Sequence, residues 1–403
     1  MSAELSDHNE TGRRTPIFDD FERSNTAPAG HEEPTFSFLN RVSGEYWEQV
    51  RTLIQEWADR ISVPKEYEEI RSRFCAANDF EFRSTFLELY LHQCLINAGY
   101  SVTIHPDTPG STRHPDFLAE RDGTGFYLEA ISPGTSSAAR GKAARTGQFY
   151  DAVNKVKNDN FFIWVTELNT GTKSAPTKKL RGALNSWLSS LDPDELEAEP
   201  ELWSTHSWSS DDGWSASFKA IPKSVDKRGE PTRTVGVYPV TVQRVDDAPK
   251  ILAAIKEKHK AYGNLEFPYI IAVGVYIMPK AREDTANALY GYLSHVLTFS
   301  DSGEVIEETP IRNSSGYFGT PESWKNRQVS AILLVNQLMP YYFQKADVEL
   351  WRHPDSERPL ADDLALPWSE IVFSSGLNEL PARISPVDFF DLPEEWPTGH
   401  PWR

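Results

Sequence analysis

The sequence predicts a mixed α/β fold, with helices and strands of α+β type, built around residues 81–192. Residues 81–98 are apolar at helical spacing and end before a glycine, which is typical of a helix. Three short alternating segments with turn signals between them follow as strands: 101–105, 116–120 and 126–132. A continuous apolar run at 161–166 predicts a buried central strand. We therefore expect an α-β-β-β-α-β core with a mixed central sheet.

Helical patterns and strand patterns also extend on both sides of this core. Residues 1–35 are polar and rich in acids, Thr, Pro and Gly, which predicts a disordered tail. Residues 36–80 carry apolar side chains at helical spacing and predict a helical extension. Residues 203–403 predict a second α/β region, in which a lysine-bearing amphipathic helix (248–262) precedes an apolar strand (269–277). We expect this region to pack on the core or to extend its sheet.

Composition narrows the class of protein. No run of 18 apolar residues occurs, so no membrane span is expected. The N-terminus has no apolar signal core, and Cys75 and Cys94 are too few for a disulfide framework or a structural zinc cluster. A cytoplasmic protein is the expectation. The net charge of −18 argues against a protein that coats nucleic acid with its whole surface.

Three acids stand out inside the predicted core. Glu88 lies in the otherwise apolar stretch LELYLHQCL, Asp116 begins the second strand, and Glu129 lies within the third. A carboxylate in an apolar helix or strand is costly to bury without a partner. A divalent cation explains the group, because Mg²⁺ (or Mn²⁺) takes oxygen ligands and often only one or two protein carboxylates. Such an ion activates water and neutralises charge on a phosphate.

The order of these acids resembles the PD-(D/E)xK nuclease superfamily, whose fold is restriction-endonuclease-like. The matching residues are Glu88 on the helix, Pro115-Asp116, and Glu129-Ala130-Ile131, and the resemblance covers residues 80–190. It implies a metal-dependent nuclease that cleaves phosphodiester bonds, DNA being favoured over RNA, with a role in defence or repair. Glu88, Asp116 and Glu129 would then be metal ligands and catalytic residues.

One position departs from the family pattern. The motif lysine, two residues after the second acid, is replaced by Ile131. Some superfamily members carry the basic residue on a neighbouring helix, and the candidates here are Lys142, Lys155 and Lys157. Gln148 lies in the same segment and would position a water. Residues 140–181 carry a charge of +6 and the remainder −24, which suits a phosphate-backbone enzyme or a solvated helix face.

Two other functions are open from the sequence. Ile131 favours a catalytically inactive, nuclease-like scaffold that binds nucleic acid or a protein partner. The tryptophans at 203, 208 and 214 suit either packing or a sugar platform, as in a two-carboxylate glycoside hydrolase. His92, four residues after Glu88, either orients that acid or is a structural side chain.

Overall fold

The computed structural model describes residues 14–403 except 77, 135–136, 157, 196–202, 230–233, 239–245, 264, 278–280, 300–304, 375 and 403. The chain divides into two compact units. Unit 1 comprises Met1–Ala27, Pro34–Pro133 and Asp246–Arg403, and unit 2 comprises Pro28–Glu33 and Gly134–Val245. The division at residue 133 falls inside the range 81–192 that the sequence predicts as one core.

Unit 1 opens with a described segment that packs instead of forming a disordered tail. Ile17 and Phe18 are buried, and the Ile17 amide donates to the Gln55 side chain at 2.8 Å. The prediction of a disordered tail is therefore corrected over residues 14–35, while residues 1–13 lie outside the described residues. The reason is that burial of these two apolar side chains, with Phe18 stacked on Phe36 at 5.6 Å, offsets the entropy cost of ordering the segment.

The first helices of unit 1 lie where the sequence predicts a helical extension, and α4 comes directly after them. Their bounds are α1 (Thr35–Arg41), α2 (Glu45–Asp59), α3 (Pro64–Cys75) and α4 (Asp79–Asn97). Asn78 caps α4, since its side chain accepts a hydrogen bond from the Phe80 amide at 2.9 Å. Most residues of α4 from Phe82 to Leu95 are buried, Glu88 being one of the exceptions. This helix therefore forms part of the core that supports the site.

A mixed sheet organises unit 1, and it has eight strands in the described part of the chain. Their order is β1-β2-β3-β8-β13-β14-β15-β16. The bounds are β1 (Ser101–Ile104), β2 (Phe117–Arg121), β3 (Thr124–Ile131), β8 (Tyr269–Val275), β13 (Ala331–Asn336), β14 (Asp347–Arg352), β15 (Ser369–Phe373) and β16 (Leu377–Leu380). Strands β1, β2 and β3 form an antiparallel meander, and β3, β8 and β13 run parallel. The mixed α/β class predicted from the sequence is confirmed.

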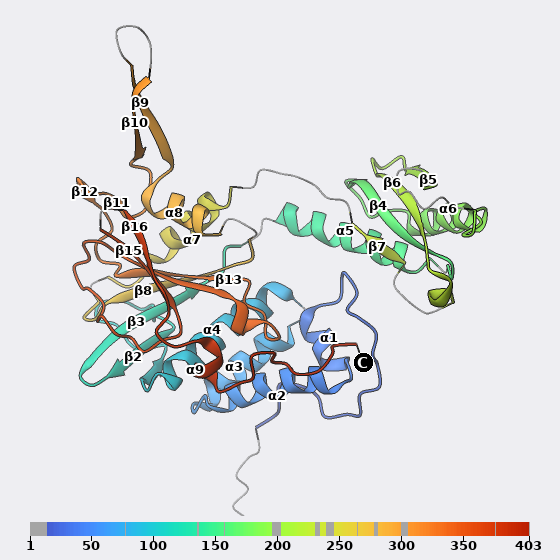
Figure 1. Ribbon diagram of the computed structural model, residues 1–403. Coiled ribbons are helices and arrows are strands. Elements are labelled where there is room, and N and C mark those ends of the chain that lie inside the picture. Colours follow the sequence, from blue (N-terminus) through green and yellow to red (C-terminus); the bar gives the residue numbers. More distant parts are fainter. Residues whose placement is uncertain are drawn as a thin grey trace, which may run out of the picture. The chain divides into compact units, whose positions relative to one another are not determined.

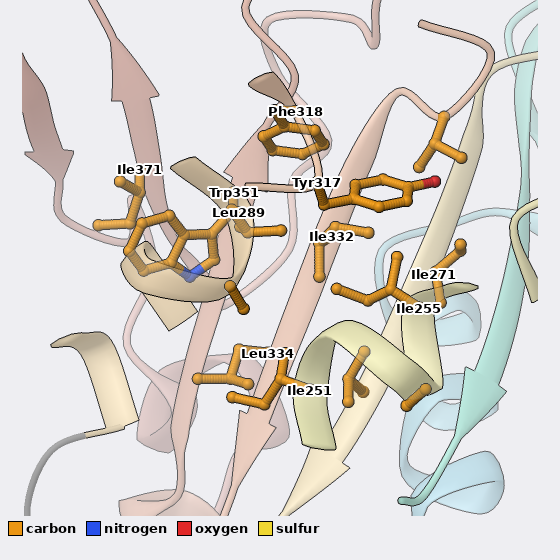
Figure 2. Packing of buried hydrophobic residues seen from close by; sticks show 14 of the residues in the cluster. Ile251, Ile255, Ile271, Leu289, Tyr317, Phe318, Ile332, Leu334, Trp351 and Ile371 are labelled. Atoms are coloured by element: carbon orange, nitrogen blue, oxygen red, sulfur yellow. The ribbon is translucent and has the colours of Figure 1, made fainter. Parts of the chain in front are cut away.

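Helices cover both faces of this sheet (Figure 1). Helices α7 (Ala248–Lys258) and α8 (Ala281–Tyr290) pack on one face. Figure 2 shows Ile255 of α7 beside Ile271 of β8, and Ile251 of α7 beside Leu334 of β13, within this core. On the opposite face α4 lies close to β8, since a Cβ added at Gly274 would come within 2.8 Å of Leu87 Cδ2.

Unit 2 is built on a separate sheet, four-stranded in its described part, with the order β5-β6-β4-β7. The bounds are β4 (Phe161–Asn169), β5 (Thr205–Ser209), β6 (Ser215–Pro222) and β7 (Val235–Val237). Helices α5 (Ser137–Asn154) and α6 (Thr177–Ser189) share its apolar core. Trp214 is buried there and stacks on Phe149 at 5.5 Å, which assigns this tryptophan to packing.

The strand expected at 161–166 is therefore not in the sheet that carries Glu129. β4 pairs with β6 and β7, whereas the parallel neighbour of β3 is β8. The physical reason is visible in the burial of the two strands. Every residue of β8 is buried, as required of a strand covered on both faces, whereas β4 alternates between buried and partly exposed residues. Along unit 1 the element order is α4-β1-β2-β3-α7-β8, with residues 134–245 inserted after β3.

The remaining short elements complete the described chain. They are η2 (Val225–Lys227), the hairpin β9 (Leu293–Phe299) and β10 (Val305–Arg312), β11 (Gly319–Thr320), β12 (Ser323–Trp324), η3 (Phe343–Lys345) and α9 (Pro386–Phe390). No helix in the described part of the chain has both the length and the apolar character that a membrane span needs.

Candidate active site

Asp116 and Glu129 meet at the hairpin of β2 and β3. The turn is Asp122-Gly123, both with positive φ (53° and 77°), which fits a two-residue hairpin and fixes the register. Phe117 pairs with Leu128, so the preceding Asp116 lies next to Glu129. The Asp116 amide donates to Glu129 Oε2 at 3.2 Å, and the Ala130 amide donates to Asp116 Oδ2 at 2.6 Å. The backbone thus holds both predicted acids at one point.

The cation at this site is Lys258, the last residue of α7. Its ammonium forms an ion pair with Glu129 Oε1, and Tyr262 Oη donates to Glu129 Oε2 at 2.6 Å. Lys258 ends α7 and Tyr262 lies in the turn after it, and the side chains of both residues reach Glu129. The side chain of Glu129 is 2% exposed and that of Lys258 is 29% exposed. The carboxylate is therefore buried, whereas the lysine side chain is partly in contact with solvent.

The pKa shifts at the site follow from this crowding of charge. Burial, then the charges of Glu129 and Glu88, raise the pKa of Asp116 well above its ordinary value. For Lys258, burial lowers the pKa, but the charge and hydrogen bond of Glu129 outweigh that effect and raise it overall. Burial and Glu129 also raise the pKa of Tyr262. At neutral pH, Lys258 is therefore a cation and Tyr262 a neutral donor.

Glu88 is held by an arginine. Arg73 binds it through two parallel hydrogen bonds of 2.6 and 2.7 Å, one to each carboxylate oxygen. Glu88 still lies close enough to raise the pKa of Asp116, and both residues line the same small cavity. Among the described residues, however, no group of three His, Cys, Asp or Glu side chains is placed to hold a metal ion. The structure therefore groups Asp116 with Glu129 and pairs Glu88 with Arg73.

His92 is a buried neutral side chain near Glu88. Burial, and then the charge of Arg60, lower the pKa of His92 to about 4. Its ring lies 5.9 Å from that of Phe117, and its Nδ1 has no hydrogen-bond partner within the described chain. These contacts fit the structural interpretation of His92 better than a proton-transfer role.

Lys142 and Gln148 both lie on α5, in unit 2. Lys142 is exposed, and Gln148 is partly buried. Lys155 follows the same helix, and Lys157 lies outside the described residues. No described contact of the site in unit 1 involves Lys142, Gln148 or Lys155, and the catalytic assignments of all four residues stay predictions. The amine found at Glu129 comes instead from Lys258, which sequence reasoning missed.

Asp116 and Glu129 face an open cleft of about 470 Å³. Its lining residues come from the loop before β2, from β3, and from α7 with the turn after it: His105, Arg113, His114, Asp116, Glu129, Glu257, Lys258, Ala261 and Tyr262. Three acids and four side chains that carry or can accept positive charge line it. A cleft of this composition suits a ligand that contains both phosphate and a cation.

The oxygen donors of Asp116 and Glu129 match the chemistry of Mg²⁺ or Mn²⁺. Magnesium sites typically use one or two carboxylates, with water and substrate phosphate completing the shell. Asp116 Oδ2 accepts the Ala130 amide, while Oδ1 has no hydrogen-bond partner among the described residues. Burial and then the charges of Glu129 and Glu88 raise the pKa of Asp116, and a divalent cation would offset the repulsion between these carboxylates. The two carboxylates therefore fit such an ion.

Comparison of the chain with protein-family models, with curated proteins and with solved structures gives no match.

Proposed function

We propose that this protein is a metal-dependent nuclease that hydrolyses phosphodiester bonds in nucleic acid, with DNA favoured over RNA. The observation that carries the proposal is the meeting of Asp116, Glu129 and Lys258 at the open cleft. Two carboxylates and an amine are the set that the PD-(D/E)xK pattern uses. The resemblance also suggests a role in defence against foreign nucleic acid or in repair.

The order of elements in unit 1 supports a restriction-endonuclease-like core. The series α4-β1-β2-β3-α7-β8 has the α-β-β-β-α-β order of that superfamily, once residues 134–245 are treated as an insertion. In this interpretation Lys258, on the core helix, supplies the amine that Ile131 does not. Superfamily members that carry the basic residue on a neighbouring helix provide the precedent.

Each side chain then has a defined task. Asp116 and Glu129 would hold Mg²⁺ or Mn²⁺, and the chemistry that this ion supplies when bound is Lewis-acid activation of water and neutralisation of phosphate charge. Lys258 places a fixed positive charge where negative charge develops on the phosphate. Tyr262 orients Glu129 by its hydrogen bond. Arg73 neutralises Glu88 and so limits the negative charge around Asp116.

The direct test is a cleavage assay with purified protein, Mg²⁺, and DNA or RNA. The Asp116→Ala variant should be inactive. A matched control is Glu120→Gln, which changes an exposed acid on β2, the strand that follows Asp116, and it should keep full activity. Cleavage that survives Asp116→Ala would refute the site assignment, and absence of cleavage by the wild type would refute the nuclease.

A catalytically inactive, nuclease-like scaffold is the second candidate, and one observation favours it. Both oxygens of Glu88 are bound to Arg73, and the positive charge of that guanidinium opposes a metal ion at the helix acid. A scaffold would bind nucleic acid or a protein partner without cleaving. Calorimetric titration with Mg²⁺ separates the two candidates, because a scaffold that takes no metal gives no heat above that of buffer.

A further inference from the structure

The loop from His105 to Asp116 is braced by its own hydrogen bonds. The His105 amide donates to the Asp116 carbonyl at 3.0 Å, which closes the loop at its base. Thr108 Oγ1 donates to the Arg113 carbonyl at 3.0 Å, and the Arg113 amide donates to Ser111 Oγ at 3.0 Å. The backbone of Arg113 is thus fixed on both sides, three residues before the acid of the candidate site.

Most of the other basic groups that line the cleft already have acidic or carbonyl partners. His105 Nδ1 lies 3.0 Å from Glu66 Oε2, and Lys258 is paired with Glu129. His114 Nδ1 lies 3.2 Å from the Pro106 carbonyl and 3.4 Å from Asp107. These contacts hold the side chains in place and satisfy their charge or their donor.

Arg113 differs from these residues. Its side chain lines the cleft and is exposed, and among the described residues no carboxylate or carbonyl binds its guanidinium. Its charge still reaches the far wall, where it favours ionisation of Tyr262 and so opposes the larger effects that raise the pKa of that phenol. A guanidinium offers paired donors that match phosphate oxygens, which makes it suited to bind a phosphate that enters the cleft.

We propose that Arg113 binds a phosphate next to the scissile one, so that oligonucleotides that carry this second phosphate bind more tightly than substrates without it. The inference rests on the proposed nuclease function and deepens it. Lys258 acts at the scissile phosphate from α7, whereas Arg113 acts from the β1–β2 loop. A contact to a phosphate that does not react strengthens ground state and transition state alike. Its loss therefore raises KM and leaves kcat unchanged.

The experiment is a neutral-phosphate scan. A short oligonucleotide that the wild type cleaves at one position is prepared with a methylphosphonate at each neighbouring linkage in turn. For the wild type, one flanking substitution should raise KM about tenfold, the loss of one charged hydrogen-bonded contact. Arg113→Gln should raise KM about tenfold on the unmodified substrate, keep kcat, and respond no further to that methylphosphonate. Lys256→Gln, an exposed cation of α7 outside the cleft lining, should behave as the wild type does.

The outcomes distinguish a failure of the proposed role of Arg113 from a failure of the proposed nuclease function. A wild type that cleaves no oligonucleotide would overturn the nuclease itself, and the role of Arg113 with it. A wild type that cleaves, beside an Arg113→Gln variant with unchanged KM or with undiminished sensitivity at every linkage, would overturn the role of Arg113 alone. Arg113→Gln should unfold at the wild-type temperature, because the exposed guanidinium makes no hydrogen bond or ion pair with the described part of the chain.

Discussion

Replacing Lys258 by Met removes the ammonium beside a carboxylate that is almost wholly buried. Breaking a buried ion pair by deleting one partner typically costs about 3–5 kcal/mol. Two features of this site reduce that figure. Glu129 keeps two other donors, Tyr262 Oη and the Asp116 amide, and Lys258 itself is 29% exposed. We therefore expect Lys258→Met to lower the free energy of unfolding by about 2 kcal/mol at pH 7.

Chemical unfolding in buffer without divalent ions measures this change, and Lys260→Met is the matched control. Lys260 is exposed and close in sequence, so its loss should change stability by less than about 0.5 kcal/mol. Adding Mg²⁺ at 100 times its Kd should stabilise Lys258→Met by about 2.7 kcal/mol, because the ion binds the folded state and not the unfolded chain. Cleavage by this variant should fall at least roughly 100-fold. Equal unfolding midpoints for the two variants, with equal cleavage rates, would show that Lys258 is not part of the site.

Three further predictions concern the charges and donors around this pair. Because the pKa of Asp116 is raised in the folded state, its stability contribution is present below the ordinary pKa of an aspartate and is lost as pH rises through the folded value. In urea titrations without metal, the free energy of unfolding of Asp116→Asn should therefore rise relative to that of the wild type as the pH increases from 4 to 8. A difference that stays constant with pH would contradict this prediction. The pKa of His92 is lowered to about 4, so its contribution is present above pH 6.5 and is lost as pH falls toward 4. His92→Leu should therefore lose less stability than the wild type as the pH falls from 6.5 toward 4. Identical pH profiles of stability for the two proteins would refute a buried, neutral His92. Tyr262→Phe removes a donor from a buried carboxylate while its ring can still pack on Tyr269, and it should cost about 1–3 kcal/mol in thermal unfolding. Unchanged stability would mean that the hydrogen bond to Glu129 does not form.

The local half of the site could be predicted from the sequence because its parts are close together along the chain. Asp116 and Glu129 are separated by 13 residues and a turn whose residues favour positive φ. Alternation along the two strands then places both acids on one side of the hairpin. Burial of a carboxylate in apolar surroundings also gave a correct signal for Glu129, which is 1% exposed.

The other half could not be predicted, because an insertion separates its parts. Lys258 is 129 residues from Glu129, and unit 2 lies between them in sequence. The available signal was a lysine-bearing helix before an apolar strand, but a helix before the apolar run at 161–166 gave the same signal. Burial on both faces distinguishes β8 from β4, and that property depends on tertiary packing. The pairing of Glu88 with Arg73, on a different helix, likewise leaves no local pattern.

The central claim, that Asp116, Glu129 and Lys258 form a metal-dependent cleavage site, is tested most directly by diffraction from crystals soaked in Mn²⁺. The claim predicts one anomalous peak bound by oxygens of Asp116 and Glu129, with the Lys258 ammonium beside it, and loss of that peak in Asp116→Asn crystals. Crystals that take up Mn²⁺ elsewhere, or that keep Lys258 and Glu129 paired with no ion next to Asp116 at millimolar Mn²⁺, would contradict it.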